Sequence, residues 1–352
     1  MPGALSRRRR ERAVVSLART HVLFPPMHAT RYHRCGLAAW DCRLADRDAA
    51  GAWAAVSRGQ RLLSTRPDGT WHGPLQLGVP PAHTLHAAFA AATQRPFTAI
   101  RDRAGLAAWG LSTSKGDPWA FTPTAAATAG PGHLGARLAR EYAIGTYVPC
   151  ATAAACSTGL YALLACADRI EDGTCTRGLA GAADGELPPW LEAGFARLGV
   201  LCGTTPPSAL DGQGTGFAPA GGAGVVAVVP GPAPWRLVAG VRLGDAGHET
   251  HFVDPRTLHT ALADLWEILP HPDLIITHAT GTAAGDRYEL AGLDGGPWRA
   301  CPRMNMKPLI GHTLGASGIV ELAVGLEAPV QRLWKLSLGF GGHLAAVAVE
   351  RE

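Results

Sequence analysis

The sequence predicts an α/β protein with a largely buried sheet. Short runs rich in β-branched and small apolar residues alternate with amphipathic stretches such as Thr257 to Leu269, an alternation typical of α/β proteins. Of the 352 residues, 47% are hydrophobic and only 17% are charged, so the chain can bury a large core. The 44 glycines suit tight turns and close packing of helices against a sheet.

Five segments are predicted as strands, because apolar β-forming residues run there between turn-forming residues. They are Ala13 to Leu17, Gly178 to Gly181, Gly224 to Val229, Leu274 to Thr277 and Ala345 to Val349. Proline and glycine cluster at residues 205–224 and 231–234. We expect the irregular connection in the middle of the chain to lie in these stretches. Residues 25–135 carry few such signals.

Charge and cysteine spacing argue against several classes of protein. The net charge of +4 is too small to indicate nucleic-acid binding. The eight cysteines show no paired C-x-x-C spacing, so we expect no metal site and no disulfide framework, and a reducing cytoplasm is favoured. There is no run of about 18 apolar residues, and the segment after the arginines at 7–10 is interrupted by Arg19 and His21. Neither a membrane span nor a signal peptide is therefore predicted.

A cysteine stands at the start of a predicted helix in the stretch AAACSTGLYALL, residues 153–164. Leu160, Leu163 and Leu164 begin an apolar helical face, and Gly173 is placed to cap its end. Cys156 would therefore lie at a helix N-terminus, where unpaired N–H groups favour the nucleophilic thiolate. Alone, this pattern is more typical of an inert core cysteine than of a functional one.

Three stretches further along the chain carry candidate partners for the cysteine. They are THATGTAAGDRYEL (277–290) with His278, NMKPLIGHTLGASGIVEL (305–322) with Lys307 and His312, and LSLGFGGHLAAVAV (336–349) with Phe340. The first places a histidine at the end of an apolar strand, where α/β folds gather their chemistry. Among 14 histidines each one alone could be structural, so the weight lies on their joint occurrence.

Taken together, the four stretches resemble the β-ketoacyl-acyl carrier protein synthases, the elongating ketosynthases of the thiolase superfamily. The family's cysteine, H-G-T-G-T, K-x-x-x-G-H and G-F-G-G motifs recur in the same order. GLAGAADGEL (178–187), FARLGVL (195–201) and LDGQGTGFAPAGGAGVVAV (210–228) extend the likeness, which covers the chain from about Ala136 to its C-terminus.

The resemblance implies the thiolase fold, with two similar α/β halves in a layered αβαβα arrangement. We expect residues 1–205 to form the half that carries the cysteine, and residues 206–352 to form the half that carries both histidine motifs. Members of the family are dimers, so a homodimer or a heterodimer with another ketosynthase-type subunit is expected.

The implied activity is decarboxylative Claisen condensation of a carrier-bound acyl chain with malonyl-acyl carrier protein, in fatty acid or polyketide-type (including aryl-polyene) biosynthesis. The acyl carrier protein would be a partner and would deliver its phosphopantetheine arm, with no cofactor bound by the enzyme. By resemblance Cys156 is the nucleophile, and the backbone N–H groups of Cys156 and Phe340 form the oxyanion hole. His278 and His312 would donate hydrogen bonds to the enolate.

The resemblance also assigns supporting roles. Lys307 matches the lysine that organises the second histidine electrostatically, and Glu289 matches the acidic residue that holds the network together. The residues implied in substrate binding are Thr280, Thr282, Gly339 and Gly341.

The sequence departs from the family pattern at several points. Ala279 replaces a glycine, Leu338 replaces a phenylalanine, and His343-Leu344 replace Thr-Asn; the segment from Gly318 to Phe340 is short. Two other functions therefore stay open: a chain-length-type or structural subunit of a heterodimeric ketosynthase, and a non-decarboxylating acyltransferase. The retained cysteine argues against the first and the pair of histidines against the second.

Overall fold

The computed structural model describes residues 29–77, 81–116, 130 and 132–352. The predicted strand Ala13 to Leu17 lies outside these residues. In the described part, one sheet runs in the order β11-β10-β12-β13-β9-β2-β8-β7-β5-β6, with β1 also paired to β9. A separate hairpin joins β3 (Ser64–Thr65) to β4 (Trp71–His72).

The long sheet consists of two five-stranded groups with the same internal order. The first group contains β2 (Cys35–Arg43), β5 (Ala107–Ser112), β6 (Tyr147–Pro149), β7 (Arg177–Asp184) and β8 (Gly222–Pro230). The second contains β9 (Trp235–Gly244), β10 (Leu274–Ile276), β11 (Arg303–Met304), β12 (Arg332–Gly339) and β13 (His343–Arg351), and β1 (Thr30–Arg31) flanks it. In the first group β7, β5 and β6 are parallel to one another, and β8 runs antiparallel between β2 and β7. In the second group β12, β10 and β11 are parallel to one another, and β13 runs antiparallel between β9 and β12. The two groups therefore repeat the same arrangement.

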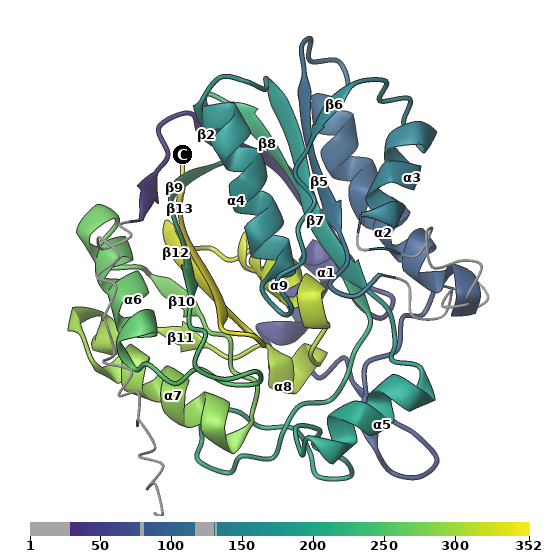
Figure 1. Cartoon of the computed structure of the whole chain (residues 1–352), viewed down its shortest axis with the longest axis vertical. Coiled ribbons are helices and arrows are strands. Elements are labelled where there is room, and N and C mark those ends of the chain that lie inside the picture. Colours follow the sequence, from purple (N-terminus) through teal and green to yellow (C-terminus); the bar gives the residue numbers. More distant parts are fainter. Residues whose placement is uncertain (1–28, 78–80, 117–129, 131) are drawn as a thin grey trace, which may run out of the picture.

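Helices separate and cover the two strand groups in five layers (Figure 1). On the outer side of the first group lie α2 (Pro81–Ile100) and α3 (His133–Glu141), and outside the second lie α6 (Arg256–Ile268) and α7 (Ala283–Asp294). Between the groups lie α4 (Thr158–Glu171) and α9 (Ser317–Gly325), with α1 (Ala49–Val56) beside α9. The remaining helices are α5 (Pro189–Arg197), α8 (Lys307–Ile310) and the 3-10 turns Pro297–Ala300 and Leu314–Ala316.

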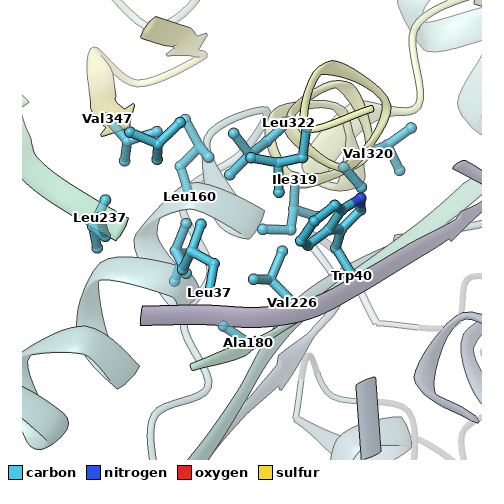
Figure 2. Close-up of a cluster of buried hydrophobic side chains, with 14 of the residues drawn as sticks. Leu37, Trp40, Leu160, Ala180, Val226, Leu237, Ile319, Val320, Leu322 and Val347 are labelled. Atoms are coloured by element: carbon cyan, nitrogen blue, oxygen red, sulfur yellow. The ribbon is translucent and has the colours of Figure 1, made fainter. Parts of the chain in front are cut away.

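The central layer holds the largest cluster of buried hydrophobic side chains in the described residues. Side chains from both strand groups and both central helices meet there, including Leu37, Leu160, Ile319 and Val347 (Figure 2). The two helices approach closely because each has a glycine as its second residue. A Cβ atom on Gly159 would lie 2.6 Å from Ile319 Cγ2, and one on Gly318 would lie 2.8 Å from Leu160 Cγ.

Four of the predicted strands lie in β7, β8, β10 and β13, and the amphipathic stretch at 257–269 forms α6, so these predictions are confirmed. The helix after the cysteine ends at Glu171, and Gly173 has the expected left-handed φ of 76°. The division expected at residue 205 stays a prediction. In the sheet, the first strand group ends with β8 at Pro230 and the second begins with β9 at Trp235. Within the described residues, no helix is long and apolar enough to cross a membrane.

Candidate active site

The loop that carries Cys156 joins β6 to α4, and its hydrogen bonds come from neutral groups. Cys156 lies just before the helix and is buried, with 8% of its surface exposed. Ser337 on β12 donates a hydrogen bond to the Cys156 carbonyl oxygen at 2.9 Å, and Ser157 donates one to the His343 carbonyl oxygen at 2.7 Å. Residues of the second strand group thus fix the loop that carries the thiol.

The glycine turn after β12 covers the thiol. A Cβ atom on Gly339 would lie 2.7 Å from the Ala154 carbonyl oxygen, so only glycine permits this approach. The next residue, Phe340, directs its backbone N–H toward the sulfur of Cys156. A hydrogen bond from this N–H favours the anionic form of the sulfur.

The thiol itself differs from the expectation of a stabilised thiolate. Burial raises the pKa of Cys156 to about 11, and the charge of Lys307 and the Phe340 N–H lower that pKa only in part. The helix end lies beneath the glycine turn and away from water, so the cost of desolvating a charged sulfur outweighs the stabilisation of the anion. At neutral pH the resting cysteine is therefore a thiol.

His278 follows the end of β10, and Glu289 on α7 holds its backbone. The two carboxylate oxygens of Glu289 accept hydrogen bonds from the N–H of His278 at 2.5 Å and from the N–H of Ala279 at 2.6 Å. Ala279, which stands where the family usually has glycine, adopts a left-handed φ of 50°. The glutamate thus fixes the backbone bend that turns the imidazole into the site.

Lys307 approaches the first histidine rather than the second. Its Nζ donates to the His278 carbonyl oxygen at 2.5 Å and lies 3.4 Å from His278 Nδ1. The resemblance implied action on the second histidine. The charge of Lys307 does lower the pKa of His312, but its hydrogen bonds go to His278 and to Glu321.

His312 lies between α8 and the 3-10 turn that precedes α9. Its Nδ1 accepts a hydrogen bond from the Leu314 N–H at 3.1 Å and lies 2.7 Å from the hydroxyl of Ser317. With Nδ1 acting as acceptor, the ring proton is assigned to Nε2. The cation beside Nδ1 of His278 assigns the same tautomer there.

The two imidazoles are adjacent and uncharged. Their ring centroids lie 5.7 Å apart at an interplanar angle of 84°. Burial is the main cause that holds both pKa values well below the usual range, and Lys307 adds to the effect. Each imidazole can therefore offer one neutral Nε2–H donor to a developing oxyanion. His278 lines the pocket at the sulfur of Cys156, whereas His312 is not among the residues that line it.

A small pocket opens above the sulfur. Six predicted site residues line it, namely Cys156, His278, Thr280, Thr282, Gly339 and Phe340. Its volume of about 40 Å³ holds only a few water molecules, so an acyl chain needs side chains to move. Gly341 does not line this pocket; its N–H donates to the Glu249 carbonyl oxygen at 2.7 Å and so ties the glycine turn to the loop after β9.

The sequence patterns missed several residues around this pocket. Thr250, His251 and Phe252 form one wall, on a loop that the Asp245 carboxylate holds through three backbone N–H groups. On α7, Tyr288 completes this wall and stacks on Phe252 with ring centroids 5.1 Å apart. No spacing rule connects these positions to the cysteine.

A second missed feature was visible in the composition. The chain has only three lysines among its 32 basic residues. Lys307 and Lys335 both bind the buried Glu321, and Lys115 binds the buried Asp184. Each of the three lysines thus forms an ion pair with a buried carboxylate. The small number of lysines in the sequence could have marked these positions as structural ones.

The chain was compared with known families and proteins. The model of the β-ketoacyl synthase N-terminal domain matches residues 148–231, and that of the C-terminal domain matches residues 259–331. Polyketide synthase ThaG of Burkholderia thailandensis is 32% identical over 200 residues, which are 49% of this chain and 3% of that protein. Polyketide synthase PksN of Bacillus subtilis is 27% identical over 203 residues, 49% of this chain and 4% of that protein. The chain thus spans a small fraction of these curated relatives.

Solved structures share the fold at low sequence identity. A β-ketoacyl synthase from Burkholderia phymatum has a TM-score of 0.78 at 18% identity, with 92% of this chain and 100% of that chain covered. A type II polyketide synthase ketosynthase in complex with its acyl-carrier protein has a TM-score of 0.76 at 16% identity, with the same coverage.

The repeated strand order and the five layers define the thiolase fold, which the solved structures share. The β-ketoacyl synthases share this fold, and the two domain models of that family match 157 of the 352 residues of this chain.

Proposed function

We propose that the protein is a condensing enzyme that joins a carrier-bound acyl chain to a malonyl unit with loss of carbon dioxide. The observation that carries this proposal is the pair of neutral imidazoles, His278 and His312, beside a buried cysteine. Simple acyl transfer has no use for a pair of neutral imidazole donors, whereas decarboxylation of malonyl forms an enolate oxygen that such donors can stabilise.

The first half-reaction is a thioester exchange. Cys156 Sγ attacks the acyl thioester of the carrier, the sulfur–carbon bond to phosphopantetheine breaks, and the cysteine proton ends on the released thiol. The backbone N–H groups of Cys156 and Phe340 would stabilise the oxyanion. Since the resting thiol is protonated, attack has to coincide with loss of that proton.

The second half-reaction makes the carbon–carbon bond. The malonyl carboxylate leaves as carbon dioxide, and its electron pair forms an enolate whose oxygen accepts the two Nε2–H bonds. The enolate carbon then attacks the Cys156 thioester, the carbon–sulfur bond breaks, and the thiolate takes up a proton. Lys307 and Glu289 hold His278 in place during this step.

The partner in this proposal is an acyl carrier protein, which brings the phosphopantetheine arm as part of the substrate, so no resident cofactor is needed. Thr280 and Thr282 line the pocket and offer hydroxyl groups to that arm. One fold relative is described as a ketosynthase in complex with its acyl-carrier protein, which supports this partner. A dimer, with itself or with a related subunit, in the cytoplasm stays part of the proposal.

Intact mass spectrometry tests the proposal first. The protein and its Cys156→Ala variant are incubated with a panel of acyl-carrier proteins, and a mass gain equal to the acyl group is expected in the wild type alone. His278→Ala and His312→Ala should load normally but fail to release carbon dioxide from malonyl carrier. Acylation of Cys156→Ala at the active site would show that the nucleophile is wrong.

A second candidate is a subunit that shapes the tunnel of a partner ketosynthase without catalysis. The small pocket and the raised pKa of Cys156 favour it, and one fold relative is described as a ketosynthase/chain length factor. That structure has a TM-score of 0.76 at 19% identity, with 92% of this chain and 100% of that chain covered. No mass gain with any donor, together with a heterodimer on co-expression, would select this function.

A further inference from the structure

A fully buried lysine on β12 is part of neither histidine motif. Lys335 has no exposed surface, and its Nζ contacts three oxygen atoms. It donates to the Thr277 carbonyl oxygen at 2.9 Å, to the Leu336 carbonyl oxygen at 2.6 Å and to Glu321 Oε2 at 2.8 Å. All three ammonium donors are thus used, which is the condition under which a buried lysine is tolerated.

The first of these contacts fixes the backbone directly before the imidazole. Lys335 binds the carbonyl of Thr277, and Lys307 binds the carbonyl of His278, the next residue. On the other edge, Glu289 binds the N–H groups of His278 and Ala279. The strand end is therefore held by two ammonium groups and one carboxylate, and Lys335 provides the anchor nearest to β10.

Charge balance gives Lys335 a second role. Glu321 lies in the central helix α9, and its two oxygens bind Lys307 at 2.7 Å and Lys335 at 2.8 Å. Glu289 is a second buried carboxylate nearby, so the cluster holds two carboxylates and two ammonium groups. Without Lys335 it would contain one uncompensated buried negative charge, an arrangement that proteins avoid.

The matching positions of the first strand group carry no such ions. The fifth residue of α4 is Ala162, whereas the fifth residue of α9 is Glu321. The residue opposite the end of β5 is Ala182, whereas the residue opposite the end of β10 is Lys335. The ion cluster therefore belongs to the strand end that carries His278 rather than to the repeated fold.

We propose that Lys335 is a positioning residue for His278, which anchors the backbone before the imidazole and balances the second carboxylate of the buried cluster. This inference rests on the proposed decarboxylation, in which the His278 Nε2–H meets the enolate oxygen. For that step the imidazole has to stay neutral and keep its orientation toward the enolate oxygen. The charge of Lys335 disfavours the protonated ring, and its hydrogen bond to the Thr277 carbonyl holds the adjacent backbone.

Five charged or titratable groups form this environment. Around His278 lie Lys307 from α8, Glu289 from α7, Glu321 from α9, Lys335 from β12, and the ring of His312. The charges of Lys307 and Lys335 both act with burial to keep the pKa of His278 low. Removing the Lys335 charge alone should therefore raise the pKa of His278.

The test compares Lys335→Met with the double variant Lys335→Met/Glu321→Gln, which removes one charge of each sign. NMR of protein labelled with ¹³C-histidine follows the His278 ring, assigned with His278→Ala. In Lys335→Met the His278 midpoint should rise, and in the double variant it should return toward the wild-type value. Lys115→Met removes a lysine bound to a different buried carboxylate and should leave the His278 midpoint unchanged.

Kinetics supply the second readout. Release of carbon dioxide from malonyl carrier should fall about 10- to 100-fold in both Lys335 variants, because the Thr277 anchor is lost in each. An unchanged His278 midpoint, or a rate within about twofold of wild type, would overturn the role of Lys335. If the wild type releases no carbon dioxide, the proposed function fails, while the His278 midpoint still decides the inference about Lys335.

Discussion

The two strand groups follow the same order, but they hold their reactive groups by different means. The first group leads into α4 through the Cys156 loop, whose hydrogen bonds come from serine hydroxyls and backbone groups. The second group presents His278 from β10, held by Glu289, Lys307 and Lys335. One loop is held by neutral contacts and the other by buried ions.

The difference follows from what each group has to do. In the proposed reaction the thiol must lose and regain a proton, and the charges that act on it oppose one another, because Lys307 and Lys115 lower its pKa while Asp184 raises it. The imidazole instead has to keep one tautomer and stay neutral, and a lysine at Nδ1 enforces both. Direct ionic contacts therefore hold the backbone of the histidine, and neutral hydrogen bonds hold the backbone of the cysteine.

Removing one lysine of the buried ion cluster should have the largest effect on stability. Lys307→Met leaves two buried carboxylates with one lysine, and we expect the free energy of unfolding to fall by about 3 to 5 kcal/mol. Urea denaturation measures it. Arg137→Met removes a surface pair with Glu141 and should change stability by at most about 0.5 kcal/mol. Equal losses in both variants would mean that the buried cluster contributes no more than a surface pair.

The protonation of Cys156 is the next test. With a pKa of about 11, the thiolate fraction at pH 7 is about 100-fold lower than for a thiol of pKa 9. The raised pKa keeps the sulfur neutral below pH 11, so alkylation by iodoacetamide should accelerate up to that pH. Peptide mapping against Cys156→Ala assigns the site. A midpoint below pH 8 would show that the helix end outweighs burial.

The close approach of the glycine turn to the nucleophile loop can be tested sterically. Gly339→Ala places a Cβ atom against the Ala154 carbonyl oxygen, and we expect a loss of about 1 to 3 kcal/mol together with slower acyl loading. Gly194→Ala in α5 meets nothing within 4 Å and should instead stabilise the protein by about 0.5 to 1 kcal/mol. Normal acyl loading by Gly339→Ala would show that the close approach of the glycine turn is not needed for the loading reaction.

The neutral contacts should have the smallest effect. Ser337→Ala removes one hydrogen bond to the Cys156 carbonyl oxygen and should cost about 1 kcal/mol. Ser157→Ala removes the matching bond to the His343 carbonyl oxygen and should cost a similar amount. Thermal unfolding compares both with Lys307→Met. A loss from either serine as large as that from Lys307 would contradict the division into neutral and ionic support.

Much of the site was predictable because its residues lie in short local patterns. The four stretches around Cys156, His278, His312 and Phe340 are each continuous in sequence, and the resemblance orders them. The Thr250 to Phe252 wall and the Glu321–Lys335 pair were missed because their partners are distant in sequence. A glutamate in an apolar helix and a lysine in an apolar strand have no local pattern that pairs them.

Local patterns in the sequence predicted the α/β class, four strands, the helix after Cys156 and the residue types of the site, because periodicity and glycine placement act over a few residues. The protonation state of Cys156, the histidine that Lys307 contacts and the cluster around Glu321 depend instead on contacts between distant segments. Desolvation and charge pairing depend on which segments meet in space, and α4, α9 and β12 meet only when the two halves of the fold close around the central layer.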